Sequence, residues 1–155
     1  MINIHATLPH DPTAPGEARA RASILGETLG DEVAGDVGRL ASELVANGVR
    51  FGDQREGIRL RLELDEHRVR VAVTDGERPA RRLMFGPSSL ETTLARTIVE
   101  QLSGQWGVER ARDGWTVWAD VDPDHPAGAG AGLATEEYGN DPGMIEATTE
   151  GGRDG

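Results

Sequence analysis

Glu43 and Asn47 lie four positions apart in the sequence, so on a helix their side chains lie one turn apart on the same face. The opposite face of that helix carries residues that fit a core: Val37, Leu40, Ala41, Leu44 and Gly48. Asparagine is unfavourable inside a helix, because its side chain competes for backbone hydrogen bonds. A carboxylate and a carboxamide in this arrangement can hold a divalent cation through oxygen atoms or orient a water molecule. The alternative is a solvated helix face with an incidental asparagine, and these two residues alone favour that alternative.

The composition limits the classes of protein to consider. The chain has 155 residues, of which 27 are acidic and 16 basic, giving a net charge of −11. This balance is wrong for direct nucleic-acid binding, which needs a basic surface. The absence of cysteine excludes disulfides, a thiol nucleophile and a zinc–cysteine site. No apolar run approaches the roughly 18 residues of a membrane span and no signal-peptide layout opens the chain, so we expect a soluble cytoplasmic protein.

The last part of the chain, residues 123–155, differs in composition from the rest. It carries seven acidic residues against one arginine, a net charge of −6, together with eight glycines and few large apolar residues. Such a segment cannot bury enough apolar surface to offset the entropy of ordering it. We therefore expect one folded domain over residues 1–122 and a disordered, acidic, glycine-rich tail over 123–155.

Alternation of apolar and polar residues predicts the strands. It is strict from Ile58 to Leu64, and it resumes at Val69, Val71 and Val73 after a turn at Asp65-Glu66, which predicts an antiparallel pair. Further strands are expected over residues 2–8, from Trp106, and over residues 115–119, with a hairpin turn at Asp113-Gly114.

Three helices are expected between these strands. The first runs from Thr13 or Gly16 to about Leu29 and has a C-terminal cap at Gly30. The second is capped by Asp31 or Asp36 and ends between Gly48 and Gly52. The third runs from about Leu90 to Leu102. Each strand has one apolar face, so the helices must cover one side of the sheet. The sequence thus predicts an α+β two-layer sandwich, a mostly antiparallel mixed sheet covered on one face by about three helices.

Four pieces of the chain stand in an order that resembles a known family. They are Glu43-x-x-x-Asn47 on a helix, Val73-Thr74-Asp75-Gly76 at a strand end, a helix entered from a loop, and Gln105-Trp106-Gly107-Val108 leading to Thr116-Val117-Trp118. Together they resemble the GHKL ATPase domain shared with histidine kinases. They are most similar to the anti-sigma-factor serine kinases, the actinobacterial ATP-binding regulators. The typical E-L-V-x-N-x-V-R-H motif of those proteins is matched by residues 43–50, and Phe51 stands in place of the final histidine. The resemblance covers about residues 1–122 and implies a Bergerat-type ATP-binding fold.

The same resemblance implies ATP and Mg2+ as cofactors and gives several residues a role. Asn47 would coordinate the Mg2+ that bridges the phosphates, and Glu43 would be the catalytic base or water-orienting group beside it. Asp75 would accept a hydrogen bond from the adenine amino group, and Gly76 would let the base approach the backbone. These roles suit the residue types, since a carboxylate can read an exocyclic amine and a glycine removes a Cβ from its path.

The phosphate half of the implied site departs from the family pattern. Thr93 and Ala95 stand where relatives carry the two glycines of a G-x-G whose amides cradle phosphates. Three loop arginines, Arg78, Arg81 and Arg82, could grip the phosphates instead. Solvated loop charges that balance an acidic chain are the equal alternative.

The implied function is that of an ATP-binding anti-sigma-factor-like regulator, a serine protein kinase that binds a sigma factor and phosphorylates an anti-anti-sigma antagonist. Arg19, on the first helix, lies where family members contact these proteins, although a solvated arginine explains it as well. The alternative is a degenerate, non-catalytic module that regulates a partner by contact, with weak or no ATP binding. A signalling ATPase unrelated to sigma factors is a third hypothesis, and a homodimer is left open.

Overall fold

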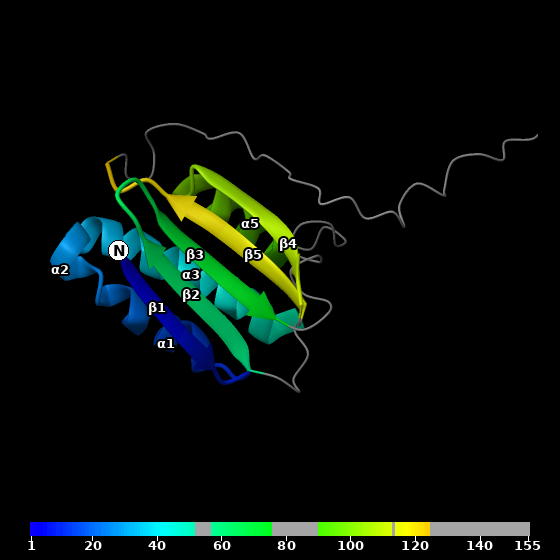
Figure 1. The fold of residues 1–155 in the computed structure, drawn as a ribbon. Coiled ribbons are helices and arrows are strands. Elements are labelled where there is room, and N and C mark those ends of the chain that lie inside the picture. The colour runs from blue at the N-terminus through cyan, green and yellow to red at the C-terminus, as the bar shows by residue number, and fades with distance from the viewer. Residues whose placement is uncertain (52–56, 76–89, 113, 125–155) are drawn as a thin grey trace, which may run out of the picture.

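The structure is a computed structural model that describes residues 1–51, 57–75, 90–112 and 114–124 of the 155-residue chain. In chain order the elements are β1 (Ile2–Leu8), α1 (Ala14–Ser23), α2 (Gly26–Leu29), α3 (Asp31–Phe51), β2 (Ile58–Leu64), β3 (Val69–Asp75), α5 (Leu90–Leu102), β4 (Gln105–Ala111) and β5 (Gly114–Val121) (Figure 1).

The described strands form one sheet in the order β1-β2-β3-β5-β4. Leu60 of β2 lies opposite Val73 of β3, which lies opposite Val117 of β5. The α+β class is confirmed, but the expected mixed sheet is wrong for these strands, because every pairing among them is antiparallel. The chain does pass from β3 through α5 into β4, which runs in the same direction as β3. Since β5 lies between the two, no parallel pair forms.

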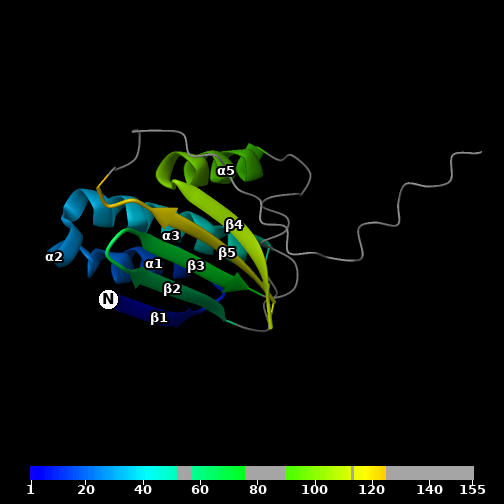
Figure 2. The same ribbon diagram turned by 45° about the horizontal axis from the view of Figure 1, so that its top comes forward.

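The described helices lie on one face of this sheet (Figures 1 and 2). The long helix α3 is central to that layer, because it contacts α1, α2 and α5 as well as strands β2 and β3. This arrangement follows from the sequence pattern, since α3 has one strongly apolar face and must bury it. The two-layer architecture expected from the sequence is confirmed.

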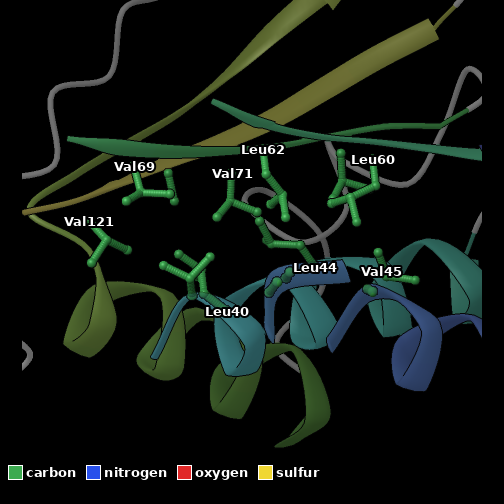
Figure 3. Packing of buried hydrophobic residues seen from close by; sticks show 14 of the residues in the cluster. Leu40, Leu44, Val45, Leu60, Leu62, Val69, Val71 and Val121 are labelled. Carbon is green, nitrogen blue, oxygen red and sulfur yellow. The ribbon is translucent and has the colours of Figure 1, made fainter. Parts of the chain in front are cut away.

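The core fills the space between α3 and the middle of the sheet. Leu60, Leu62 and Val71 point from the strands toward Leu40 and Leu44 of α3 (Figure 3). All five side chains are buried. Period-two alternation in the strands and the helical spacing in α3 meet here, so the apolar residues of both layers share one interior.

The opposite face of the sheet carries polar side chains around one tryptophan. Trp118 of β5 is only 8% exposed, and its ring lies over Gly107 of the neighbouring strand, where a Cβ would come within 2.8 Å of the ring. The Arg70 guanidinium carbon stacks on the other side, 4.2 Å from the ring centroid. Hydrogen bonds that Arg70 donates to Asp120, at 2.7 and 2.8 Å, raise the pKa of the arginine above its ordinary value.

The first predicted helix is wrong in one respect, because the structure divides it into α1 and α2. The N–H groups of Ile24 and Leu25 bond to carbonyls three residues back, a tighter turn than the α-helix. This turn leaves Ile24 exposed and buries Leu25 in the core. The expected glycine cap at Gly30 is confirmed, with a positive φ of 82°.

The predicted cap of α3 is also wrong. Asp31 is the first residue of the helix and Asp36 lies inside it, while the Gly30 carbonyl accepts the bond from Ala34. Gly30 therefore closes α2 and opens α3, and no residue is left between the two helices for an acidic cap. Asp31 still favours the helix, because a carboxylate in the first turn interacts well with the helix dipole.

The core residues of the described chain all lie between Leu8 and Val121. Residues 125–155, nearly all of the predicted tail, lie outside the described part of the chain. No helix in the described ranges is both long and apolar enough to cross a bilayer.

Candidate functional site

The C-terminal half of α3 carries the two residues with which the site prediction begins. Glu43 is partly exposed, whereas Asn47, one turn later, is only 3% exposed. The sequence pattern assigned both to a face opposite the packed one. The structure corrects this for Asn47, whose carboxamide is enclosed.

Asn47 has a buried oxygen, Oδ1, that accepts no hydrogen bond. Leaving a buried acceptor unsatisfied costs about 1–3 kcal/mol, so such an atom calls for an explanation. A ligand that supplies a donor or a cation to this oxygen is one explanation. The buried oxygen argues against the solvated helix face that the sequence left open.

Asp75 reaches the same region from the sheet. Asp75 is the last residue of β3 and follows Val69, Val71 and Val73 at intervals of two residues. Alternate residues of a strand point to the same face, so the Asp75 side chain is directed to the side that the helices cover. Asp75 is only 5% exposed. An aspartate is rarely so buried without a role for its carboxylate.

Gly48 is where the helix and the strand meet. A Cβ at Gly48 would lie 2.9 Å from Oδ2 of Asp75 and 3.3 Å from Cδ1 of Ile58. The α3 backbone therefore approaches the Asp75 carboxylate more closely than any side chain would allow. Because Asn47 directly precedes Gly48, the structure brings the carboxamide and the carboxylate to one end of the sheet.

The part that Gly48 plays is not apparent in the sequence, where Gly48 is only one of the core-facing positions of the helix. The available signal was its residue type. Glycine inside a helix destabilises it by about 0.5–1 kcal/mol relative to alanine, so a glycine in the middle of the Asn47 turn implies a close approach. The sequence cannot say which group makes that approach.

The residues present fit a metal bound together with a phosphate ligand better than a metal bound alone. Among the residues that the structure describes, no three His, Cys, Asp or Glu side chains gather to hold a metal ion. Mg2+ is commonly held by one or two protein side chains together with water and substrate phosphates. Asn47 Oδ1 would be such a ligand, and Glu43, one turn earlier on α3, would orient a water molecule or hydroxyl beside it.

Three of the predicted cofactor residues cannot be placed. Gly76 and Arg78 lie outside the described residues. Thr93 lies in α5, but its side chain is outside the described part of the chain, as is that of Ala95. The phosphate half of the predicted site therefore stays a prediction.

Arg19, the predicted partner-binding residue, lies on α1 and has an exposed side chain. Its Nη2 donates a hydrogen bond of 3.1 Å to Oγ of Ser42, the residue before Glu43. Ser42 in turn donates to the Arg39 carbonyl. Arg19 is thus an exposed cation tied to the helix that carries Glu43 and Asn47.

Arg96, on α5, has a surface position in the structure. It is exposed on α5, forms an ion pair of 3.2 Å with Glu100 one turn later, and lies 5.7 Å from the Trp106 ring centroid. These contacts account for Arg96 without a ligand.

No protein-family model matches the chain, and no curated protein does. Among solved structures, it is similar to the histidine kinase domain of the blue-light activated histidine kinase from Erythrobacter litoralis EL346, with 20% identity and a TM-score of 0.48. The match covers 71% of this chain and 61% of that chain, which is less than two thirds of its length.

Proposed function

We propose that this chain is an ATP-binding regulator of the GHKL type, which binds Mg-ATP between the C-terminal half of α3 and the end of β3. The observation that carries the proposal is that two polar side chains, Asn47 and Asp75, are both buried where α3 approaches the end of β3 at Gly48. The order of the sequence motifs that resemble the GHKL domain supports it independently.

Each of the three polar residues has a distinct task in the proposed site. Asp75 accepts a hydrogen bond from the exocyclic amine of adenine, which an acceptor-only carboxylate suits. Asn47 offers Oδ1 to the Mg2+ that accompanies the phosphates. Glu43, partly exposed one turn earlier, orients the attacking hydroxyl or water and accepts its proton.

In phosphoryl transfer the protein contributes little covalent catalysis, because most of the rate enhancement comes from positioning the reactants and neutralising their charge. Bound Mg2+ supplies the charge neutralisation at the phosphates. The chain's own contribution is to fix the base through Asp75 and to hold Asn47 and Glu43 in one rigid helix. The burial of Asp75 and Asn47 excludes water from these contacts and strengthens them.

The finer form of the proposal is a serine protein kinase that binds a sigma factor and phosphorylates an anti-anti-sigma antagonist. Its support is the likeness of residues 43–50 to the anti-sigma kinase motif. Arg19 is the proposed contact residue, and its exposure on α1 is compatible with that role. The hydrogen bond to Ser42 connects this contact to the nucleotide-binding helix.

The second candidate is a non-catalytic binding module that has kept the fold and the partner contact. Thr93 and Ala95 favour it, since they replace the glycines whose amides would cradle phosphates. The two candidates differ in nucleotide affinity and in phosphate transfer to a partner.

Titration calorimetry with Mg-ATP tests the proposed site. The unmodified 155-residue chain should release heat on binding. Asn47→Ala and Asp75→Ala should each weaken binding by about tenfold or more, because each removes a polar contact in a buried site. Arg96→Ala, at an exposed position on α5, is the control and should bind normally. A flat trace for the unmodified chain at millimolar Mg-ATP would eliminate the ATP-binding proposal and leave the second candidate.

Affinity purification from the native host tests the partner. A sigma factor or a single-domain antagonist should co-purify with the chain, and Arg19→Ala should reduce its recovery. Arg21, also exposed on α1, provides the control substitution Arg21→Ala. Equal recovery with both variants would remove Arg19 from the interface, and recovery of neither kind of partner would contradict the sigma-regulator role.

A further inference from the structure

Gly48 has no conformational reason to be glycine. It lies within α3, and the glycines with positive φ in the described chain are Gly30 and Gly114. An alanine at position 48 would be a better helix former. The reason for glycine must therefore be a steric one.

The space beside Gly48 is filled by the side chain that is proposed to bind the base. A Cβ there would lie 2.9 Å from Asp75 Oδ2, 3.7 Å from Asp75 Cγ and 3.3 Å from Ile58 Cδ1. By contrast, a Cβ at Gly35, on the same helix, would meet nothing within 4 Å. The contact at Gly48 is thus specific to this position and is made mainly with a carboxylate.

Any side chain at position 48 would have to displace that carboxylate. Real Cβ atoms do not approach other heavy atoms to 2.9 Å, and Ile58 crowds the new methyl group on another side. Interiors are packed too densely to absorb such a shift elsewhere, and Asp75 is 5% exposed. Asp75 Oδ2 is the nearest atom, so the carboxylate is the group that must move away from α3.

We propose that Gly48 is a specificity-determining residue, which acts by seating the Asp75 carboxylate against α3 in the position that selects a purine with a 6-amino group. The inference rests on the proposed nucleotide site and adds a residue to it. A carboxylate oxygen accepts a hydrogen bond from an amine. It receives none from a bare ring carbon and is repelled by a carbonyl oxygen. Displacement of the carboxylate therefore removes discrimination between bases, while the phosphate contacts are kept.

Competition calorimetry with two nucleotides tests this role. The probes are Mg-ATP and the Mg complex of purine riboside triphosphate, which lacks the 6-amino group. The unmodified chain should prefer ATP by about tenfold or more, the range for a hydrogen bond to a charged group. In Gly48→Ala, ATP affinity should fall to near that of the purine analogue, whose own affinity changes by less than about twofold.

Gly35→Ala is the matched control and should keep the preference for ATP, because its Cβ meets open space. Should Gly48→Ala fail to fold, adding Ile58→Val removes the atom that lies 3.3 Å from the new methyl group and leaves the contact with Asp75. The double variant should then fold and still lack the preference.

The outcomes separate this inference from the proposed function. An equal loss of affinity for both nucleotides would mean that Gly48 serves general packing, and an unchanged preference would mean that the carboxylate does not need the space. Either result overturns the role of Gly48 while the nucleotide site stands. If the unmodified chain binds neither nucleotide, the proposed function fails and the role of Gly48 fails with it.

Discussion

On the face of the sheet opposite the described helices, Arg70 stabilises two enclosed groups at once. It donates two hydrogen bonds to Asp120, a side chain only 10% exposed, and it covers the Trp118 ring. Arg68 reaches the same carboxylate with one bond of 3.1 Å but is itself 44% exposed. A planar guanidinium suits this double task, because it can bond along its edge and stack on its face.

Arg70→Ala is expected to lower the free energy of unfolding by about 1–3 kcal/mol, because it leaves a buried carboxylate with a weaker partner and uncovers a tryptophan. Urea denaturation followed by tryptophan fluorescence measures this change. The free energy of unfolding of Arg70→Lys should lie between those of the unmodified protein and Arg70→Ala. Lysine keeps the charge but cannot form the two parallel hydrogen bonds of a guanidinium.

Arg61→Ala is the control for this prediction. Arg61 pairs with Glu63 at 3.2 Å, but its side chain is 46% exposed, so its loss should change stability by about 0.5 kcal/mol or less. Comparable losses for Arg61 and Arg70 would contradict the idea that burial of the partner carboxylate decides the effect.

At the scale of elements, α3 connects the helix layer to the candidate site, and its glycines have different reasons to be there. Gly48 makes room for Asp75, and Gly38 lets α1 approach, since a Cβ at Gly38 would lie 3.2 Å from Arg19 Cγ and 3.6 Å from Ala22 Cβ. Gly35 is exposed and has no neighbour of this kind. Substitutions at the three positions should therefore have three different effects.

Gly35→Ala is expected to stabilise the protein by about 0.5–1 kcal/mol, because alanine has the higher helix propensity and costs nothing in contacts here. Gly38→Ala should gain less or destabilise, because its methyl group would crowd α1. Thermal unfolding followed by circular dichroism compares the two. An equal gain at both positions would show that α1 does not pack closely on α3 at Gly38.

At the scale of the whole molecule, the core of the described chain ends at Val121. Truncation after Asp124 should therefore change the free energy of unfolding by less than about 0.5 kcal/mol. Truncation after Thr116, which removes Val117, Ala119 and Val121 from the core, should abolish cooperative unfolding. Calorimetric scans of both chains measure this, and a large loss on the first truncation would mean that residues 125–155 contribute to the fold.

Much of the fold could be predicted, because it follows from the spacing of apolar residues within single strands and helices. Strict alternation in β2 and β3 sets which side chains face the helices, and the strong apolar stripe of α3 requires burial. The division between α1 and α2 could not be predicted in this way. It depends on Leu25 turning into a core that the local sequence does not display.

The candidate site, too, could be predicted from the sequence only in part. Residue type and spacing by themselves determined that Glu43 and Asn47 share a turn of a helix and that Asp75 ends a strand, since these follow from periods of 3.6 and 2. Only the tertiary structure decided that Asn47 is enclosed and that Asp75 lies against Gly48. Burial and close approach depend on contacts between segments far apart in the chain. The spacing of residues within one helix or strand does not give the distance between two such segments.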